Sequence, residues 1–235
     1  MQHMSPTSTH TAAPAGVRLE NHLRATGIVP VVTIEAASDA PALGAALNAG
    51  GLPIAEITFR THAAADAIRA LRDAFPDFLV GAGTVLDLPT LERAVAAGAG
   101  FVVAPGFNPV IVDRCLELGI PVVPGVSTPT DIEAALGRGL ELLKFFPAEA
   151  AGGLAFLRAV AAPYAGVSFM PTGGITRDNL PRYLSHPFVA ACGGSWIAPE
   201  RAISDGRFDE ITAAAAEAVS LAARATTTSD ETRKP

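Results

Sequence analysis

Lys144 is the residue whose setting points most directly to chemistry. The chain has seventeen basic side chains, of which only Lys144 and Lys234 are lysines, and Lys234 lies in the polar C-terminal end. Lys144 stands between the mostly apolar run 140–143 and two phenylalanines. An arginine stays protonated, whereas a lysine in an apolar setting loses its proton readily and becomes a nucleophilic amine. The pattern favours a lysine that forms a Schiff base. The alternative is a lysine that buries its stem and extends its charge into solvent.

Glu56 is a carboxylate inside the strand-like run 54–59. Side chains alternate along a strand, so Glu56 shares a face with Ile54 and Thr58, and the covered face of a strand is an unfavourable place for an acid. One interpretation is a structural ion pair with Arg60. The other is a general acid and base that works beside Lys144, which leaves Arg60 to bind a substrate carboxylate through its planar guanidinium. The presence of Lys144 favours the second interpretation.

Two glycine pairs, Gly173-Gly174 and Gly193-Gly194, follow late apolar runs, and Ser195 comes directly after the second pair. Glycines let backbone amides approach an anion closely, and a helix that begins just beyond them adds a favourable dipole. Tight turns also need glycine. Two such pairs at corresponding positions nevertheless favour a phosphate site over plain turns.

Short apolar runs recur roughly every twenty residues, and each is followed by a helix-like segment. Nearly continuous apolar runs are typical of strands that are covered on both faces, and therefore of a parallel sheet. The expected strands are 28–34, 54–58, 79–82, 101–104, 121–123, 140–145, 168–170 and 189–192. The expected helices include 18–26, 40–49, 63–75, 89–97, 109–118, 130–137 and 207–224.

This alternation predicts one α/β domain with the (β/α)8 TIM-barrel fold over 18–225, including an extra N-terminal helix before the first strand. The segments 1–17 and 226–235 are predicted to be disordered tails. A doubly wound open sheet is the alternative, but no GxGxxG motif stands between a strand and a helix. In a barrel the functional side chains gather at the C-terminal ends of the strands. Lys144, Glu56 and the two glycine pairs all follow that rule.

Composition excludes several other classes of function. The net charge of −6 provides no basic surface for nucleic acid. The longest apolar runs are broken by Gly and Pro and are too short to cross a membrane. The histidines show no spacing typical of metal ligands. Cys115 and Cys192 lack a spacing motif and are predicted to be buried free thiols of a cytoplasmic protein. Glu149 is interpreted as an acid in the first turn of a helix.

Several motifs resemble the 2-keto-3-deoxy-6-phosphogluconate (KDPG) aldolase family, which includes bifunctional enzymes that cleave 4-hydroxy-2-oxoglutarate (KHG). The resemblance runs from about residue 18 to residue 224 in the family's order and spacing, and its most specific string is KFFPAE. The motifs are GIVPV at 27–31, EITFRT at 56–61, GAGTV at 81–85, PGVST at 124–128, KFFPAE at 144–149, PTGGI at 171–175 and GGSW at 193–196.

The resemblance implies a homotrimeric class I aldolase that needs no metal or cofactor and acts on a phosphorylated keto acid. By position, Lys144 would form the Schiff base and Glu56 would move protons. The substrate-binding residues would be Arg60 and Thr84 for the pyruvate carboxylate, Phe146 as a wall, Pro105 in a bordering loop, and Gly173, Gly174, Gly194 and Ser195 for the phosphate. The sequence 107–109 departs from the family pattern in that bordering loop, which leaves the preference for the aldehyde partner open.

Two other functions fit parts of the pattern. A sugar-phosphate isomerase or epimerase on the same barrel would use the glycine loops, but it leaves Lys144 without a task and needs an acid/base pair that the sequence does not place. A non-catalytic binding protein would need neither Lys144 nor Glu56. The aldolase accounts for all of these residues together.

Overall fold

The computed structural model describes the backbone of residues 15–231 and the side chains of residues 16–225. Parts of the predicted tails, 1–14 and 232–235, lie outside the described residues. Residues 15–17 belong to the first helix, and the last helix continues to Glu231, so the predicted tail boundary at 226 falls inside a helix. The described chain is one α/β unit, consistent with a single domain.

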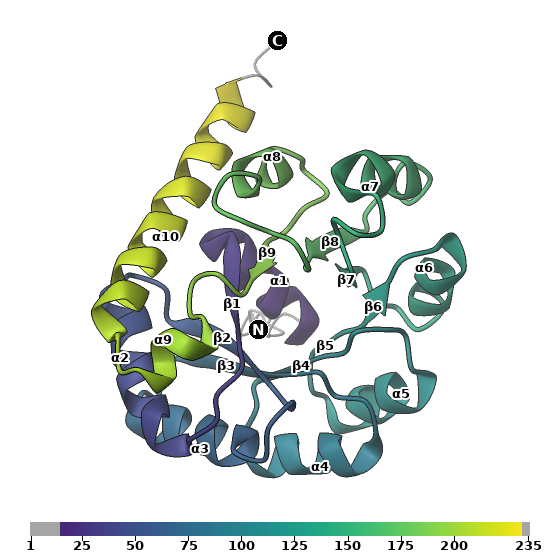
Figure 1. The fold of residues 1–235 in the computed structure, drawn as a ribbon. Coiled ribbons are helices and arrows are strands. Elements are labelled where there is room, and N and C mark those ends of the chain that lie inside the picture. The colour runs from purple at the N-terminus through teal and green to yellow at the C-terminus, as the bar shows by residue number, and fades with distance from the viewer. Residues whose placement is uncertain (1–14, 232–235) are drawn as a thin grey trace, which may run out of the picture.

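Helices alternate with parallel strands and surround a curled sheet (Figure 1). The strands are β1 (Ile28–Val32), β2 (Ile54–Thr58), β3 (Leu79–Gly83), β4 (Phe101–Val103), β5 (Val122–Val123), β6 (Gly125–Val126), β7 (Leu142–Phe145), β8 (Ser168–Pro171) and β9 (Cys192–Gly194). The helices are α1 (Ala15–Thr26), η1 (Ala37–Asp39), α2 (Ala40–Ala49), α3 (Ala64–Ala74), α4 (Leu88–Ala96), α5 (Pro109–Leu118), α6 (Pro129–Leu136), α7 (Gly153–Ala161), α8 (Leu180–Leu184), α9 (Glu200–Ser204) and α10 (Phe208–Glu231).

The sheet differs from the predicted closed barrel in its continuity. The strands pair in the order β5-β4-β3-β2-β1-β9 in one sheet and β6-β7-β8 in another. β5 lies within the predicted fifth strand, 121–123, whereas β6 was not predicted; the two are separated by Pro124, which has no N–H to donate to a ladder. On the opposite side only isolated bridges, such as Thr172 with Gly193, connect β8 to β9. The fold is therefore TIM-barrel-like, and the expectation of one continuously paired eight-stranded barrel was wrong.

Strand register determines which side chains face the interior. Glu56 on β2 pairs with Val31 on β1 and Gly81 on β3, and paired residues of parallel strands point to the same face. Two glycines make room on that face. A Cβ at Gly81 would lie 2.3 Å from the ring of Phe101, and a Cβ at Gly83 would lie 2.2 Å from Glu56 Oε1. The interior is thus filled by an aromatic ring in one layer and by a carboxylate in the next layer toward the C-terminal end of β3.

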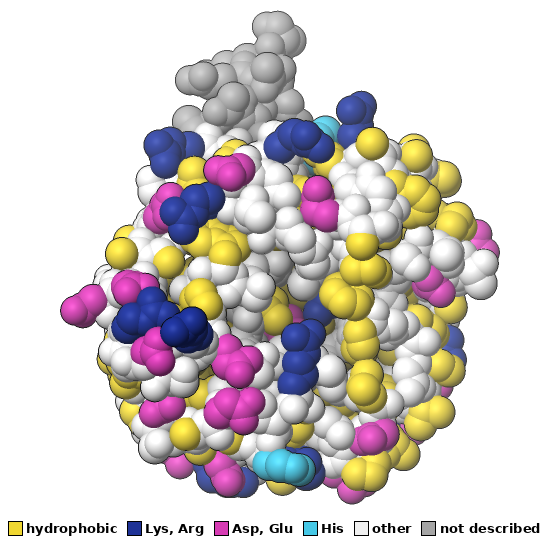
Figure 2. Space-filling model, viewed as in Figure 1, with side chains coloured by type: hydrophobic (Ala, Val, Ile, Leu, Met, Phe, Trp, Pro, Cys, Tyr) yellow, Lys and Arg dark blue, Asp and Glu magenta, His cyan; other side chains and the backbone are white. Residues whose placement is uncertain are grey.

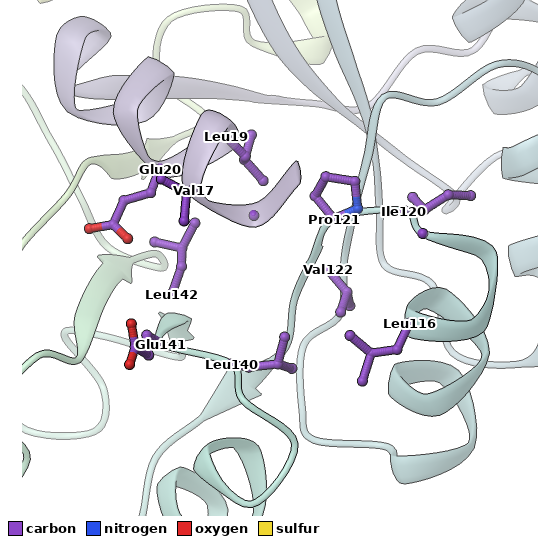
Figure 3. A pocket seen from close by; sticks show the side chains of 12 residues that line it. Val17, Leu19, Glu20, Leu116, Ile120, Pro121, Val122, Leu140, Glu141 and Leu142 are labelled. Carbon is purple, nitrogen blue, oxygen red and sulfur yellow. The ribbon is translucent and has the colours of Figure 1, made fainter. Parts of the chain in front are cut away.

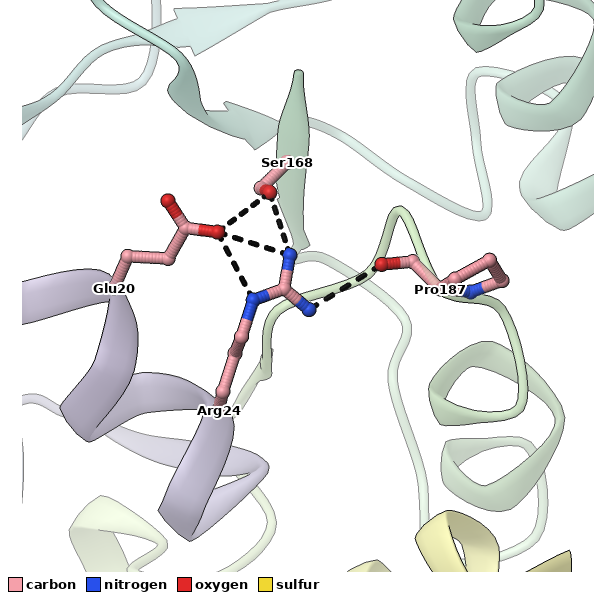
Figure 4. A network of polar contacts seen from close by, with 4 residues as sticks. All are labelled: Glu20, Arg24, Ser168 and Pro187. Atoms are coloured by element: carbon pink, nitrogen blue, oxygen red, sulfur yellow. Dashed lines mark hydrogen bonds and ion pairs between the residues drawn. The ribbon is translucent and has the colours of Figure 1, made fainter. Parts of the chain in front are cut away.

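The N-terminal end of the sheet is covered by α1. Leu19 and Leu23 of this helix are buried in the core. Its polar face is fixed to the first residue of β8, because Arg24 Nη2 donates to Ser168 Oγ at 2.6 Å and Ser168 Oγ donates to Glu20 Oε1 at 2.7 Å (Figure 4). A second contact, from Arg24 Nη1 to the carbonyl of Pro187, measures 3.3 Å. These bonds close the end of the sheet that lies away from the predicted chemistry.

An apolar cavity of about 260 Å³ remains beside α1 (Figure 3). Leu19, Leu116, Ile120, Leu140 and Leu142 line most of it. Among the described residues, the acids on its wall are Glu20 and Glu141, and none of the residues predicted to do chemistry lines it. We interpret it as a packing gap between α1 and the ends of the strands.

Candidate active site

The structure brings Lys144 and Glu56 together across the interior. Lys144 lies on β7 and Glu56 on β2, and Lys144 Nζ is 3.4 Å from Glu56 Oε1. Lys144 is 5% exposed and Glu56 is fully buried. The ammonium therefore does not extend into solvent, which rules out the structural alternative for Lys144. Within residues 15–231 no ion pair joins Glu56 to Arg60, so the alternative for Glu56 is wrong as well.

The second carboxylate oxygen of Glu56 is the most informative polar atom of the site. Glu56 Oε2 is buried and has no hydrogen-bond partner among the described residues. A buried polar atom without a partner costs roughly 1–3 kcal/mol, and native proteins contain only a few of them. The oxygen is adjacent to an amine and is available to take a proton from a bound molecule. This arrangement suits an acid and base better than a purely structural ion pair.

Phe146 lies between Lys144 and the first glycine loop. Lys144 Nζ is 5.3 Å from the centre of the Phe146 ring. A Cβ at Gly173 would lie 3.3 Å from the same ring, so the loop packs against it. Phe146 therefore lies beside the Lys144 amine and against the loop, and its role as a wall of the site stays a prediction.

The first glycine pair adopts a backbone that favours glycine, whereas Gly193 and Gly194 lie in β9. The elements that follow both pairs differ from the expectation. Gly173 and Gly174 have φ values of 97° and 82°, which side chains rarely tolerate. The next helices, α8 and α9, are five residues long and begin several residues later. Residues 176–179 form a turn instead, in which Thr176 N donates to Asn179 Oδ1 at 2.8 Å. The expected helix dipole directly beyond each glycine pair is therefore absent, and an anion there would depend on loop amides.

The remaining predicted residues are more exposed than Lys144 and Glu56. Arg60 and Ser195 are exposed, and Thr84 and Pro105 are partly exposed. Among the described side chains, no hydrogen bond or ion pair joins Arg60 or Ser195 to Lys144. Pro105 is tied to the site indirectly, because a Cβ at Gly125, the partner of Lys144 in the sheet, would lie 2.1 Å from the Pro105 carbonyl oxygen.

Two inward-facing residues were not singled out from the sequence. Gly125 allows the loop at Pro105 to approach β6, and Thr172 is a buried hydroxyl whose Oγ1 donates to the Met170 carbonyl at 3.3 Å. A Cβ at Gly193 would lie 2.4 Å from Thr172 Oγ1. Both residues occur in the motifs PGVST and PTGGI. The two motifs could be recognised in the sequence, but only the strand register in the structure shows which of their positions face inward.

The structure offers neither a metal centre nor a reactive thiol within its described part. No group of three or more His, Cys, Asp or Glu side chains there could hold a metal ion. Cys115 and Cys192 are free and buried, as predicted. Burial raises the pKa of Cys115 to about 11 and raises the pKa of Cys192 further still. Neither thiol is ionised near neutral pH, so neither competes with Lys144 as a nucleophile.

The described helices and surface bear on two other classes of protein, those that span a membrane and those that bind nucleic acid. None of the described helices is long and apolar enough to cross a membrane. Basic and acidic side chains are interspersed over the face in Figure 2, which shows no continuous basic patch for nucleic acid.

The chain was compared with known proteins. The family model for KDPG and KHG aldolase matches residues 19–214. A 2-dehydro-3-deoxy-phosphogluconate aldolase of Treponema pallidum (strain Nichols) is 51% identical over 186 residues, which cover 79% of this chain and 89% of that protein. The KHG/KDPG aldolase of Escherichia coli (strain K12) is 42% identical over 192 residues, 82% of this chain and 90% of that protein.

Solved structures show the same likeness. A KDPG aldolase from Legionella pneumophila, with pyruvate captured at low pH as a covalent carbinolamine intermediate, superposes with a TM-score of 0.81. It is 40% identical in sequence, and the match covers 87% of this chain and 97% of that one.

Thr84 generates a prediction about stability. Its φ of 57° lies in the left-handed region, where a β-branched residue is strained by roughly 1–3 kcal/mol. Glycine removes this strain at an entropic cost of about 0.5–1 kcal/mol. We therefore expect Thr84→Gly to raise the free energy of unfolding in urea by about 1 kcal/mol.

Thr90 provides the matched control because it lies inside α4. Thr90→Gly should lower the free energy of unfolding by a few tenths to about 1 kcal/mol, as glycine does inside helices. Equal losses in the two variants would show that the Thr84 backbone stores no strain.

Proposed function

The chain belongs to the KDPG and KHG aldolase family and is a lyase that breaks a carbon–carbon bond; we propose that it cleaves KDPG to pyruvate and glyceraldehyde 3-phosphate through a Schiff base on Lys144. The observation that carries this proposal is the buried pair of Lys144 and Glu56, whose Nζ and Oε1 atoms are 3.4 Å apart. The carbinolamine of the Legionella relative supports the same chemistry.

The first half of the reaction forms the imine. Glu56 accepts a proton from the Lys144 ammonium, and the neutral amine attacks the C2 carbonyl carbon of the keto acid. The carbonyl oxygen becomes the hydroxyl of a carbinolamine. Glu56 returns its proton to this hydroxyl, which leaves as water, so Glu56 is a carboxylate again. The product is a protonated imine, whose positive nitrogen can accept an electron pair from the neighbouring bond.

The second half breaks the C3–C4 bond. Glu56 Oε2, which lacks a partner in the protein, takes the proton of the C4 hydroxyl. The electrons of the C3–C4 bond move toward the imine nitrogen, so C4 leaves as the aldehyde and an enamine remains on Lys144. Glu56 gives this proton to C3 of the enamine, and water hydrolyses the resulting imine to release pyruvate and restore the amine.

Substrate-binding roles follow from position around this centre. We assign the pyruvate carboxylate to Arg60 and Thr84 at the rim, and Phe146 as the wall beside Lys144. Gly173, Gly174, Gly194 and Ser195 are assigned to the phosphate, and Pro105 to the border near the aldehyde. The support for these roles is the resemblance to the family together with the strand ends on which these residues lie.

Further proposals extend to the second substrate, assembly and location. Cleavage of KHG to pyruvate and glyoxylate is supported by the name of the Escherichia coli relative. A homotrimer in the cytoplasm is what the family resemblance implies. Exposed apolar side chains such as Leu86 and Val110, which are 57% and 55% exposed, support self-association. Sedimentation velocity would measure the oligomeric state directly.

Lys144→Arg tests the reaction. Pyruvate release from KDPG, followed with a coupled dehydrogenase, should fall by more than about 10³-fold, because arginine keeps the charge but cannot supply a neutral amine. Lys234→Arg makes the same replacement at the other lysine and should keep full activity. Substantial turnover by folded Lys144→Arg protein would refute the Schiff-base assignment.

Glu56→Gln tests the proton transfers. The amide keeps the size of the carboxylate but cannot take a proton, so kcat should fall about 10²- to 10⁴-fold while KM changes much less. A variant whose KM rises with kcat unchanged would show that Glu56 only binds substrate.

A further inference from the structure

A second polar pair lies next to the first glycine loop and is not used by the reaction. Tyr183 on α8 is fully buried, and its hydroxyl donates a short hydrogen bond to Glu149 Oε1. Glu149 lies in the segment that follows β7, ahead of α7 rather than in its first turn. Burial, together with the Glu149 carboxylate, raises the pKa of the Tyr183 hydroxyl. The hydroxyl therefore keeps its proton and remains a donor to Glu149 at working pH.

Glu149 contacts the glycine loop through both its backbone and its side chain. Ala148 N donates to the Thr172 carbonyl at 2.8 Å, and Glu149 N donates to the Gly173 carbonyl at 3.0 Å, so the pairing of β7 with β8 continues beyond both strands. A Cβ at Gly174 would lie 2.7 Å from Glu149 Cβ and 2.8 Å from its Cγ. The side chain of Glu149 thus packs directly on Gly174.

The opposite side of Gly174 is fixed as well. Asn179 Nδ2 donates to the Gly174 carbonyl at 3.0 Å. In the described part of the chain, no group accepts a hydrogen bond from the N–H of Gly174 or of Ile175. The loop is therefore held by its carbonyls and its α-carbon, while two consecutive amides stay available to an anion.

We propose that Glu149 and Tyr183 are positioning residues that hold the Gly173-Gly174 loop in the shape that binds the substrate's phosphate. This inference rests on the proposed function, since it specifies how the phosphate end of that site is built. Glu149 connects two parts of the site, because it lies five residues after Lys144 and packs on the phosphate loop. Tyr183 anchors Glu149 to the core. The pair should affect binding of the phosphate and leave the chemistry at Lys144 unchanged.

Tyr183→Phe separates these effects, because it removes the hydroxyl and keeps the ring that fills the core. We expect KM for KDPG to rise about tenfold, the effect of losing one hydrogen bond to a charged group. Pyruvate carries no phosphate, so its C3 hydrogens should exchange with deuterium oxide at a rate within about twofold of the wild type. Proton NMR measures this exchange, which reports enamine formation on Lys144.

Tyr164→Phe is the matched control. Tyr164 is the other of the chain's two tyrosines, and its hydroxyl donates to Glu133 Oε1 at 3.2 Å on the exposed surface. This variant should leave both KM and the exchange rate at wild-type values. Glu149→Ala should also raise KM for KDPG. The KM of the double variant should not exceed the higher KM of the two single variants, because both substitutions remove the same hydrogen bond.

Two results would overturn the inference. One is a wild-type KM for KDPG in folded Tyr183→Phe and Glu149→Ala proteins. The other is an equal loss of KDPG cleavage and pyruvate exchange, which would place the effect at Lys144 or in the fold as a whole. If Tyr183→Phe fails to fold, the KM for KDPG and the pyruvate exchange rate of Glu149→Ala test the inference alone. A wild-type protein that neither cleaves KDPG nor exchanges pyruvate would instead refute the proposed function.

Discussion

The interior of this protein contains a cation and an anion in contact, and the surrounding structure has to make that arrangement possible. Burying a charge costs several kcal/mol, and the cost is offset only when a partner is held in good geometry. Lys144 and Glu56 come from strands of two different sheets and meet at 3.4 Å because both point inward. Gly83 and Gly125 provide the space, since side chains there would collide with Glu56 or with the loop at Pro105.

The N-terminal and C-terminal ends of the sheet have different roles. At the N-terminal end, α1 is fixed to β8 through Arg24 and Ser168, so that end is closed. At the C-terminal end lie Thr84, whose positive φ is unusual for a residue other than glycine, and the loop of Gly173 and Gly174. The strands give the Lys144 centre its rigidity. The loops beyond them determine which molecules reach it, and Glu149 and Tyr183 connect the rigid part to the loop.

Periodicity and end signals predicted much of this architecture from the sequence. β2, α2 and α5 have the predicted bounds, because each has a clear apolar pattern and a distinct end. β6 was missed because Gly125 and Val126 form too short a run to show an apolar pattern. The last strand lies at Cys192–Gly194, later than predicted, since glycines carry no apolar signal. Lys144 and Glu56 were predicted together, whereas Tyr183 and Glu149 were not, because only folding brings these distant residues into contact.

The most direct test of the account is to trap the covalent intermediate. The wild-type protein would be incubated with pyruvate, reduced with borohydride, and analysed by mass spectrometry of the intact chain and its peptides. The account predicts one pyruvate-dependent adduct, located on Lys144. An unmodified Lys144 in folded protein, or an adduct on another residue, would contradict the central claim that the buried lysine is the nucleophile.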